Sequence, residues 1–194
     1  MTFRLLMVLL AGALLPLCVS CAGDTGPAPP GILVISADDL GTQLGSYGDL
    51  TIPTPNIDAL AARGTRFTRA YVTQPSCSSS RAAFLTGLYP HQNGQLGLAH
   101  MGFGMTRDWP VMPRLLKEQR GYFTALAGKL HVAPTSAFEF FDDLAAESAP
   151  PWTLDIDRVG EKAASYFKRA GGTPFYIQID LADTHPPFVR QHGG

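Results

Sequence analysis

The chain has 194 residues, of which 45% are hydrophobic and 16% are charged, and its formal net charge at pH 7 is −1. This composition predicts a packed globular domain and excludes an intrinsically disordered chain. The near-neutral charge gives no indication of nucleic-acid binding or of a polybasic membrane contact. An anionic ligand would therefore have to be held by local cations or by a metal ion.

The first thirty residues predict an export signal followed by a tether. Arg4 precedes an apolar run over residues 5–19, which is short for a membrane span but typical of the core of a secretory signal. We expect a signal peptide over residues 1–21, with Cys21 as a candidate site for a lipid anchor; an uncleaved N-terminal anchor would export the domain equally well. Residues 22–30 are rich in Gly and Pro and predict a flexible tether. The remainder, residues 31–194, is expected in the periplasm, outside the cell or lipid-anchored at the cell surface.

Cys77 is the only cysteine after this leader, because the other two are Cys18 and Cys21. An exported domain with one cysteine cannot form an internal disulfide, and a lone thiol outside the cell is prone to oxidation. This position therefore calls for a chemical explanation.

Short apolar runs alternate with amphipathic segments along the rest of the chain. In order, we expect a strand over residues 31–36, a helix from 55 that Gly64 ends, a strand over 67–72, a helix over 80–88 that starts near Cys77, a helix over 112–119, a strand over 122–127, a helix over 155–169 and a strand over 174–180. This alternation predicts an α/β fold with a mainly parallel sheet flanked by helices. Polar residues repeatedly follow the strands, at the edge where such sheets bind ligands.

Two of these polar groups are candidates for binding a cation and an anion. Asp38 and Asp39 follow the first strand and could supply oxygen ligands to a divalent cation, or they could form a solvated turn. Cys77 and Arg81 are four residues apart and share one face if the helix begins at Cys77. The free N–H groups of a helix start, together with an arginine, favour an anion or an activated nucleophile. The alternative is a structural cysteine beside a surface arginine.

Three more polar residues follow the later strands. Lys129 and His131 alternate, so in an extended segment both point the same way. The lysine could neutralise an anionic ester and the histidine could transfer a proton, or both could be an ordinary polar strand end. His185 follows the last expected strand, where a lone histidine is usually a turn residue.

Taken together, the segments resemble the type I sulfatases of the alkaline phosphatase superfamily. Five stretches match in family order, and they are Ile32–Asp39, Thr54–Leu60, Cys77–Gly87, Gly128–His131 and Asp183–Pro186. Residues 90–94 and 97–100 look most like the heparan N-sulfatase (sulfamidase) branch; we interpret His91 there as loop structure. The resemblance implies an alkaline-phosphatase-like domain over residues 31–194 that hydrolyses sulfate esters or sulfamates, with a sulfated carbohydrate as substrate.

The resemblance also implies a role for each matching residue. Cys77 would be oxidised to formylglycine by a formylglycine-generating or anaerobic sulfatase-maturing enzyme, and one hydroxyl of the hydrated aldehyde would attack sulfur. Asp38, Asp39 and the modified Cys77 would bind a calcium ion. The other implied roles are charge stabilisation by Arg81 and Lys129, deprotonation of the diol by His131, and protonation or positioning of the leaving group by His185.

Two departures from the family pattern shape these expectations. Ser79 stands where the maturation signal usually has proline or alanine, so conversion of Cys77 is conditional. Residues 1–194 also lack the later metal ligands and second lysine of the family, so we expect a sheet that is incomplete at the C-terminal side and a chain that alone is poorly stable and inactive. Two alternatives stay open: a phosphodiesterase or phosphonate monoester hydrolase of the same superfamily, and a non-catalytic fragment that binds sulfated glycans.

Overall fold

The fold was analysed in a computed structural model, which describes residues 28–147, 156–182 and 184–186. The expected signal peptide and most of the expected tether lie outside the described residues. The main helices and strands are, in chain order, β1 (Ile32–Ala37), α1 (Pro55–Arg63), α2 (Cys77–Thr86), α3 (Pro90–Asn93), α4 (Met112–Arg120), β2 (Phe123–Lys129), β3 (Asp143–Glu147), α5 (Ile156–Ala170) and β4 (Phe175–Leu181). Three short 3-10 turns, Gly45–Tyr47, Ala99–Met101 and Thr135–Phe138, lie between them.

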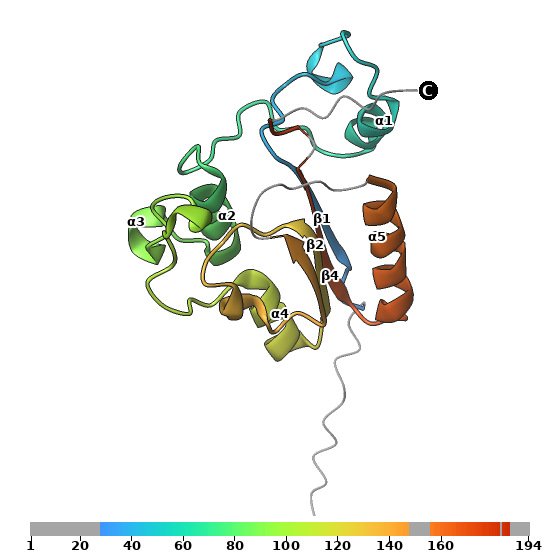
Figure 1. Ribbon diagram of the computed structural model, residues 1–194. Helices are drawn as coiled ribbons and strands as arrows, with labels where there is room; N and C mark the ends of the chain where they lie inside the picture. The colour runs from blue at the N-terminus through green and yellow to red at the C-terminus, as the bar shows by residue number, and fades with distance from the viewer. Residues whose placement is uncertain (1–27, 148–155, 183, 187–194) are drawn as a thin grey trace, which may run out of the picture.

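The described strands form one parallel sheet in the order β1-β4-β2-β3. Helix α5 covers one face, and α2 and α4 lie on the other (Figure 1). Each face has its own apolar core, one containing Leu85 and Leu126 and the other Val159 and Ile177. The predicted α/β fold with a parallel sheet flanked by helices is therefore confirmed.

The two central strands, β2 and β4, are buried and lie close together. β2 and β4 are buried along almost their whole length, as expected of parallel strands covered on both faces. Gly128 lies where these two strands run closest, with φ of 103°, and a side chain there would collide with the carbonyl oxygen of Asp180. Only glycine tolerates both the positive φ and this close approach.

The sequence predicted one strand that the structure does not contain, over residues 67–72, and missed one that it does contain, β3. Residues 67–72 are irregular rather than extended, and the side chains of Phe67, Tyr71 and Val72 are largely exposed. Their β-branched and aromatic composition favours a strand only where a neighbouring strand pairs with it, and here none of the described strands does. Conversely, β3 escaped prediction because Ala145 and Ala146 have low strand propensity.

The apolar residues of α1 do not form the buried stripe expected of a packed helix. Ile57 and Leu60 are both substantially exposed, and α1 buries none of its residues. The helix is held instead by polar contacts at its start, where Asp58 accepts a hydrogen bond from the backbone N–H of Ser46 and Thr54 Oγ1 accepts one from Gly45.

Within the described part of the chain, no helix is long and apolar enough to cross a membrane.

Candidate functional site

The candidate site lies at the carboxyl ends of β1, β2 and β4, next to the start of α2. Asp38 follows β1, Lys129 ends β2, Asp180 lies near the end of β4, and Cys77 and Arg81 occupy the first turns of α2. A cavity of about 1190 Å³ opens between β1 and α2, and Asp38, Cys77, Arg81 and Asp180 are among the residues that line it. The structure therefore brings together side chains that are far apart in the sequence.

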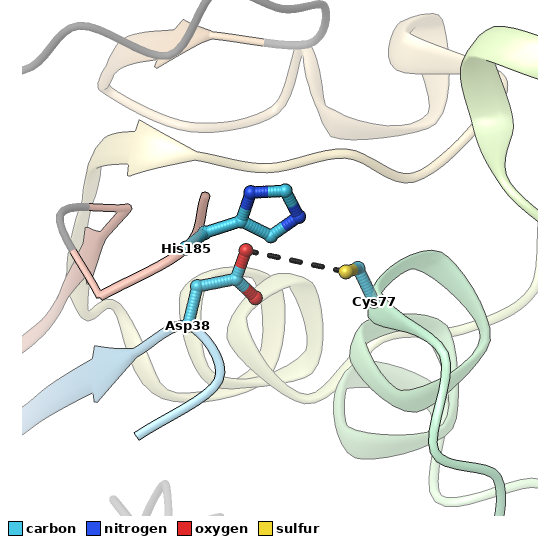
Figure 2. Close-up of side chains that lie close together, drawn as sticks. All are labelled: Asp38, Cys77 and His185. Atoms are coloured by element: carbon cyan, nitrogen blue, oxygen red, sulfur yellow. Dashed lines mark hydrogen bonds between the residues drawn. The ribbon is translucent and has the colours of Figure 1, made fainter. Parts of the chain in front are cut away.

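Cys77 is the first residue of α2, in agreement with the helix start predicted near it. Ser76 precedes it in extended conformation, and Gly87 ends the helix in left-handed conformation with φ of 70°. The Cys77 Sγ atom points toward Asp38 and lies 4.0 Å from its Oδ2 atom (Figure 2). Burial and the nearby Asp38 carboxylate raise the pKa of the Cys77 thiol, against the opposing charges of Lys129 and Arg81. The thiol is thus held protonated, and a protonated thiol is a weak nucleophile.

Asp38 is a buried carboxylate held between two cations. Lys129, which is fully buried, donates a hydrogen bond to Asp38 Oδ2, and Arg81 Nη2 lies 3.4 Å from Oδ1. Burial alone would raise the pKa of Asp38, but the Lys129 and Arg81 contacts outweigh burial and hold this pKa below its usual range. Asp38 is therefore ionised and its oxygens are fixed in place.

The arginine is fixed just as firmly as the carboxylate. Arg81 Nη1 donates to the backbone carbonyl of Lys129 at 2.6 Å and lies 3.3 Å from Asp180 Oδ1. Asp180 was not recognised from the sequence. Its signal was an acidic residue in a strand that is otherwise buried, where a charge needs a partner. Because Asp180 forms an ion pair with Arg81, it belongs to the same charge cluster.

Asp39 and His185 lie at the rim of the cluster. Asp39 adopts a positive φ of 57°, and its side chain is 53% exposed, unlike that of Asp38. His185 Nε2 lies 3.9 Å from Asp39 Oδ2, and His185 also approaches Asp38 and Cys77 (Figure 2). The structure therefore places His185 beside Cys77 and Asp38.

His131 does not lie in an extended segment, so the alternation expected for Lys129 and His131, which assumes one, does not apply to it. Its backbone turns to a positive φ of 48° immediately after β2 ends, which breaks the extended register. The buried His131 ring stacks on His100 with centroids 5.0 Å apart, and its Nε2 atom lies 2.8 Å from Nδ1 of His100. Burial, with the added charges of Lys129, His100 and Arg81, lowers the pKa of His131 to about 4.

The loop that carries His100 is held by two buried amides. Gln95 Nε2 donates to the carbonyls of Gly97 and Phe103 at 2.7 and 3.0 Å, and Gln95 Oε1 accepts from the Ala133 N–H at 3.2 Å. Asn93 similarly ties α3 to the end of α2 through the carbonyl of Leu88. Gln95 and Asn93 thus fix the loop that places His100 against His131.

His91 has a different place from His100. It lies in α3 with an exposed side chain and stacks on Tyr89 with ring centroids 5.6 Å apart. His91 therefore lies in a short helix rather than in the loop expected from the sequence.

Asp38, Cys77 and His185 are the described residues whose donor atoms gather closely enough to hold a metal ion, all within 4.8 Å of one another. A carboxylate suits a hard cation such as calcium, whereas a thiol and an imidazole do not. Asp38, with Asp39 next to it, therefore fits calcium, and Cys77 would fit it only with an oxygen in place of its sulfur. The arrangement can hold a divalent cation and an anion side by side, because Arg81 and Lys129 flank the same carboxylate.

Comparison with known proteins decides the family. The family model described as Sulfatase matches residues 30–192. The chain belongs to the sulfatase family. Among its relatives, the steryl-sulfatase of Mus musculus is 41% identical over 140 residues, covering 66% of this chain and 22% of that protein. The N-sulphoglucosamine sulphohydrolase of Homo sapiens is 34% identical over 164 residues, covering 81% of this chain and 32% of that protein.

A solved structure supports the fold independently. A protein of the alkaline phosphatase superfamily from Vibrio parahaemolyticus superposes with a TM-score of 0.61 at 24% identity, covering 86% of this sulfatase chain and 43% of that chain. The chain thus has the alkaline-phosphatase-like fold. It spans about a fifth to a third of the length of the relatives it matches.

Proposed function

We propose that this sulfatase chain carries the nucleophile and the first metal ligands of an exported hydrolase that cleaves sulfate esters or sulfamates on sulfated glycans. The nucleophile would be formylglycine made from Cys77, and the metal would be calcium held by Asp38, Asp39 and the modified Cys77. The observation that carries this proposal is the position of Cys77, at the start of α2 and 4.0 Å from a carboxylate that Lys129 and Arg81 hold ionised.

The environment of Cys77 supports a modified residue rather than a thiol nucleophile. Catalytic thiols are usually activated by cations or a helix start that lower their pKa. Here burial and Asp38 raise the pKa of Cys77, so the unmodified thiol would react poorly. A hydroxyl of hydrated formylglycine, in contrast, offers oxygen to a hard cation, and bound calcium would polarise the sulfate oxygens and favour deprotonation of that hydroxyl.

The geometry of the cationic residues supports the roles proposed for them. Arg81 and Lys129 are held rigidly at the first turns of α2 and the end of β2, so they can stabilise negative charge at the nucleophile and at sulfate without reorganising. His185 lies at the rim beside Cys77, where it can protonate or orient the leaving oxygen or nitrogen. By the family resemblance, His131 would take the proton from the nucleophile. Its low pKa keeps the ring in the neutral form, which can accept a proton.

The substrate class and the maturation partner are part of the same proposal. The human relative is named for hydrolysis of N-sulphoglucosamine, a sulfated sugar, and it aligns with 81% of this chain. A sulfated carbohydrate is therefore the substrate to test first. Cys77 would be converted by a formylglycine-generating or anaerobic maturing enzyme that reads the residues after it, and export would follow from the expected signal over residues 1–21.

The test uses the complete gene product made with and without a formylglycine-generating enzyme. Mass analysis of the peptide containing Cys77 reports whether the thiol has become an aldehyde. Rates are then measured with calcium on an aryl sulfate, N-sulfoglucosamine and an aryl phosphodiester, with Cys77→Ala as the matched control. We expect sulfate or sulfamate hydrolysis only in converted protein. Converted protein that cleaves the phosphodiester faster than either sulfated compound would refute the proposal.

Residues 1–194 alone are expected to be inactive in the same assay. Calcium takes about 6–8 oxygen ligands, and Asp38 and Asp39 provide few of them. Turnover by the isolated 194 residues would contradict this expectation.

A further inference from the structure

A row of buried polar side chains runs along one face of β4 toward the site. The Tyr176 hydroxyl donates to Gln178 Oε1 at 2.6 Å, and Gln178 Nε2 donates to Asp180 Oδ2 at 2.7 Å. Ser36 on β1 donates a further hydrogen bond to Asp180 Oδ1. The three β4 side chains are at most 3% exposed. Strands buried on both faces are usually apolar, and each of these polar groups is costly to bury unless it is paired.

Every described neighbour of the Asp180 carboxylate offers a donor. Ser36 and Arg81 face Oδ1, and Gln178 faces Oδ2. Burial raises the pKa of Asp180, whereas the contacts with Arg81, Ser36 and Gln178 oppose that rise and favour the ionised carboxylate. The row therefore ends in a buried carboxylate that faces Arg81.

The Arg81 guanidinium contacts two carboxylates, and the two have different proposed roles. Its Nη2 atom lies 3.4 Å from Asp38 Oδ1, and its Nη1 atom lies 3.3 Å from Asp180 Oδ1. Asp38 is the proposed calcium ligand, so a bound cation would compete with Arg81 for its oxygens and would repel the guanidinium. Asp180 faces Arg81 from the interior of the sheet. Its ion pair with Arg81 would remain when Asp38 coordinates the metal.

We propose that Asp180 is a positioning residue that retains Arg81 in the site while a divalent cation occupies Asp38. This inference rests on the proposed function for the identity of the cation and of the reaction. Asp180 lies outside the five stretches that carry the family resemblance, and its role is inferred from its contacts in this structure. Its charge also offsets one of the two buried cations, so that Asp38 is not their sole counter-ion.

The test replaces Asp180 with asparagine in the complete gene product and follows Arg81 directly. Nitrogen-15 NMR of the Arg81 guanidinium reports whether rotation of its terminal groups is restricted. In the wild type we expect restricted rotation with and without calcium, whereas in Asp180→Asn calcium should release it. Calorimetric titration without substrate should show calcium bound about tenfold more weakly by the variant, because a negative charge near the site is lost and calcium must displace Arg81 from Asp38, its remaining carboxylate partner.

Kinetics provide a second readout. Loss of a positioned charge-assisted hydrogen bond predicts a fall in kcat of about 10- to 100-fold on a sulfate ester, with KM changed much less. Ser36→Ala removes one hydrogen bond to Asp180 without changing charge, and it should shift every readout in the same direction by a smaller amount. It therefore keeps the test decisive if Asp180→Asn fails to fold.

Asp143→Asn is the matched control. Asp143 is also a carboxylate bound by side chains, with Arg169, Lys162 and Tyr166 around it, but it lies at the start of β3. This variant should lose stability without changing calcium affinity or the Arg81 signals.

The outcomes separate the two proposals. Arg81 signals that stay restricted in calcium-loaded Asp180→Asn, together with unchanged calcium affinity, would overturn the role of Asp180. Converted wild-type protein that cleaves no sulfated compound would overturn the proposed function, while the Arg81 signals would still decide the role of Asp180.

Discussion

Acidification should destabilise this protein through His131. The pKa of His131 is lowered to about 4 by burial and by the charges of Lys129, His100 and Arg81, whereas a histidine in the unfolded chain titrates near 6.5. Between these values the unfolded chain binds more protons, so the stabilisation is complete above about pH 6.5 and is lost as the pH falls toward 4. The loss corresponds to about 3 kcal/mol over the whole window and about 2 kcal/mol by pH 5.

The assay is urea unfolding followed by circular dichroism between pH 7 and 4.5, in the wild type and in His131→Asn. Asparagine is chosen because it tolerates the positive φ of 48° at this position. The contributions of other titrating groups, including Asp180, whose pKa burial raises, largely cancel when the two proteins are subtracted. We expect the difference in unfolding free energy to fall by about 2 kcal/mol from pH 7 to pH 5. Parallel curves would refute the reasoning, and an NMR titration of the ring would locate the error.

Three further predictions concern the strand ends and the nucleophile. Gly128→Ala should cost more than about 3 kcal/mol of unfolding free energy, because its side chain would strike the Asp180 carbonyl; a normal urea midpoint would contradict this. Lys129→Met should cost about 2–3 kcal/mol in the same measurement by leaving Asp38 with one cation fewer, and an unchanged midpoint would show that the pair adds nothing. Cys77→Ala should abolish sulfate hydrolysis while changing stability by less than about 1 kcal/mol, and residual turnover would place the nucleophile elsewhere.

The architecture was largely predictable because buried parallel strands and their helices leave strong local patterns. β1, β2 and β4 were found within two residues of their ends, and α2 was placed with its start at Cys77. The failures came where tertiary pairing overrides local preference. Residues 67–72 have strand-like composition but no strand beside them among those described, and β3 is a strand through its pairing with β2 despite its alanines.

The site was predictable as a set of residues but not as a network. Asp38, Cys77, Arg81 and Lys129 all meet where the strand ends predicted. The contacts of Asp180 could not be foreseen, because β4 and α2 are brought together only by the sheet order. For His131 the sequence did not show where the extended backbone stops: β2 ends at Lys129 and His131 has a positive φ, so the alternation rule does not apply to it.

The charges around Cys77 support the proposal that this cysteine is the precursor of formylglycine rather than a thiol nucleophile. The described cluster sets the carboxylates of Asp38 and Asp180 against the cations of Arg81 and Lys129, so the buried charges balance and neither sign dominates at the sulfur. Burial and the nearby Asp38 carboxylate disfavour a thiolate here, which is why the pKa of Cys77 rises. The proposed divalent cation at Asp38 would shift this balance toward positive charge and would favour an oxygen nucleophile and an anionic substrate. The proposed metal and the proposed modification of Cys77 therefore support each other.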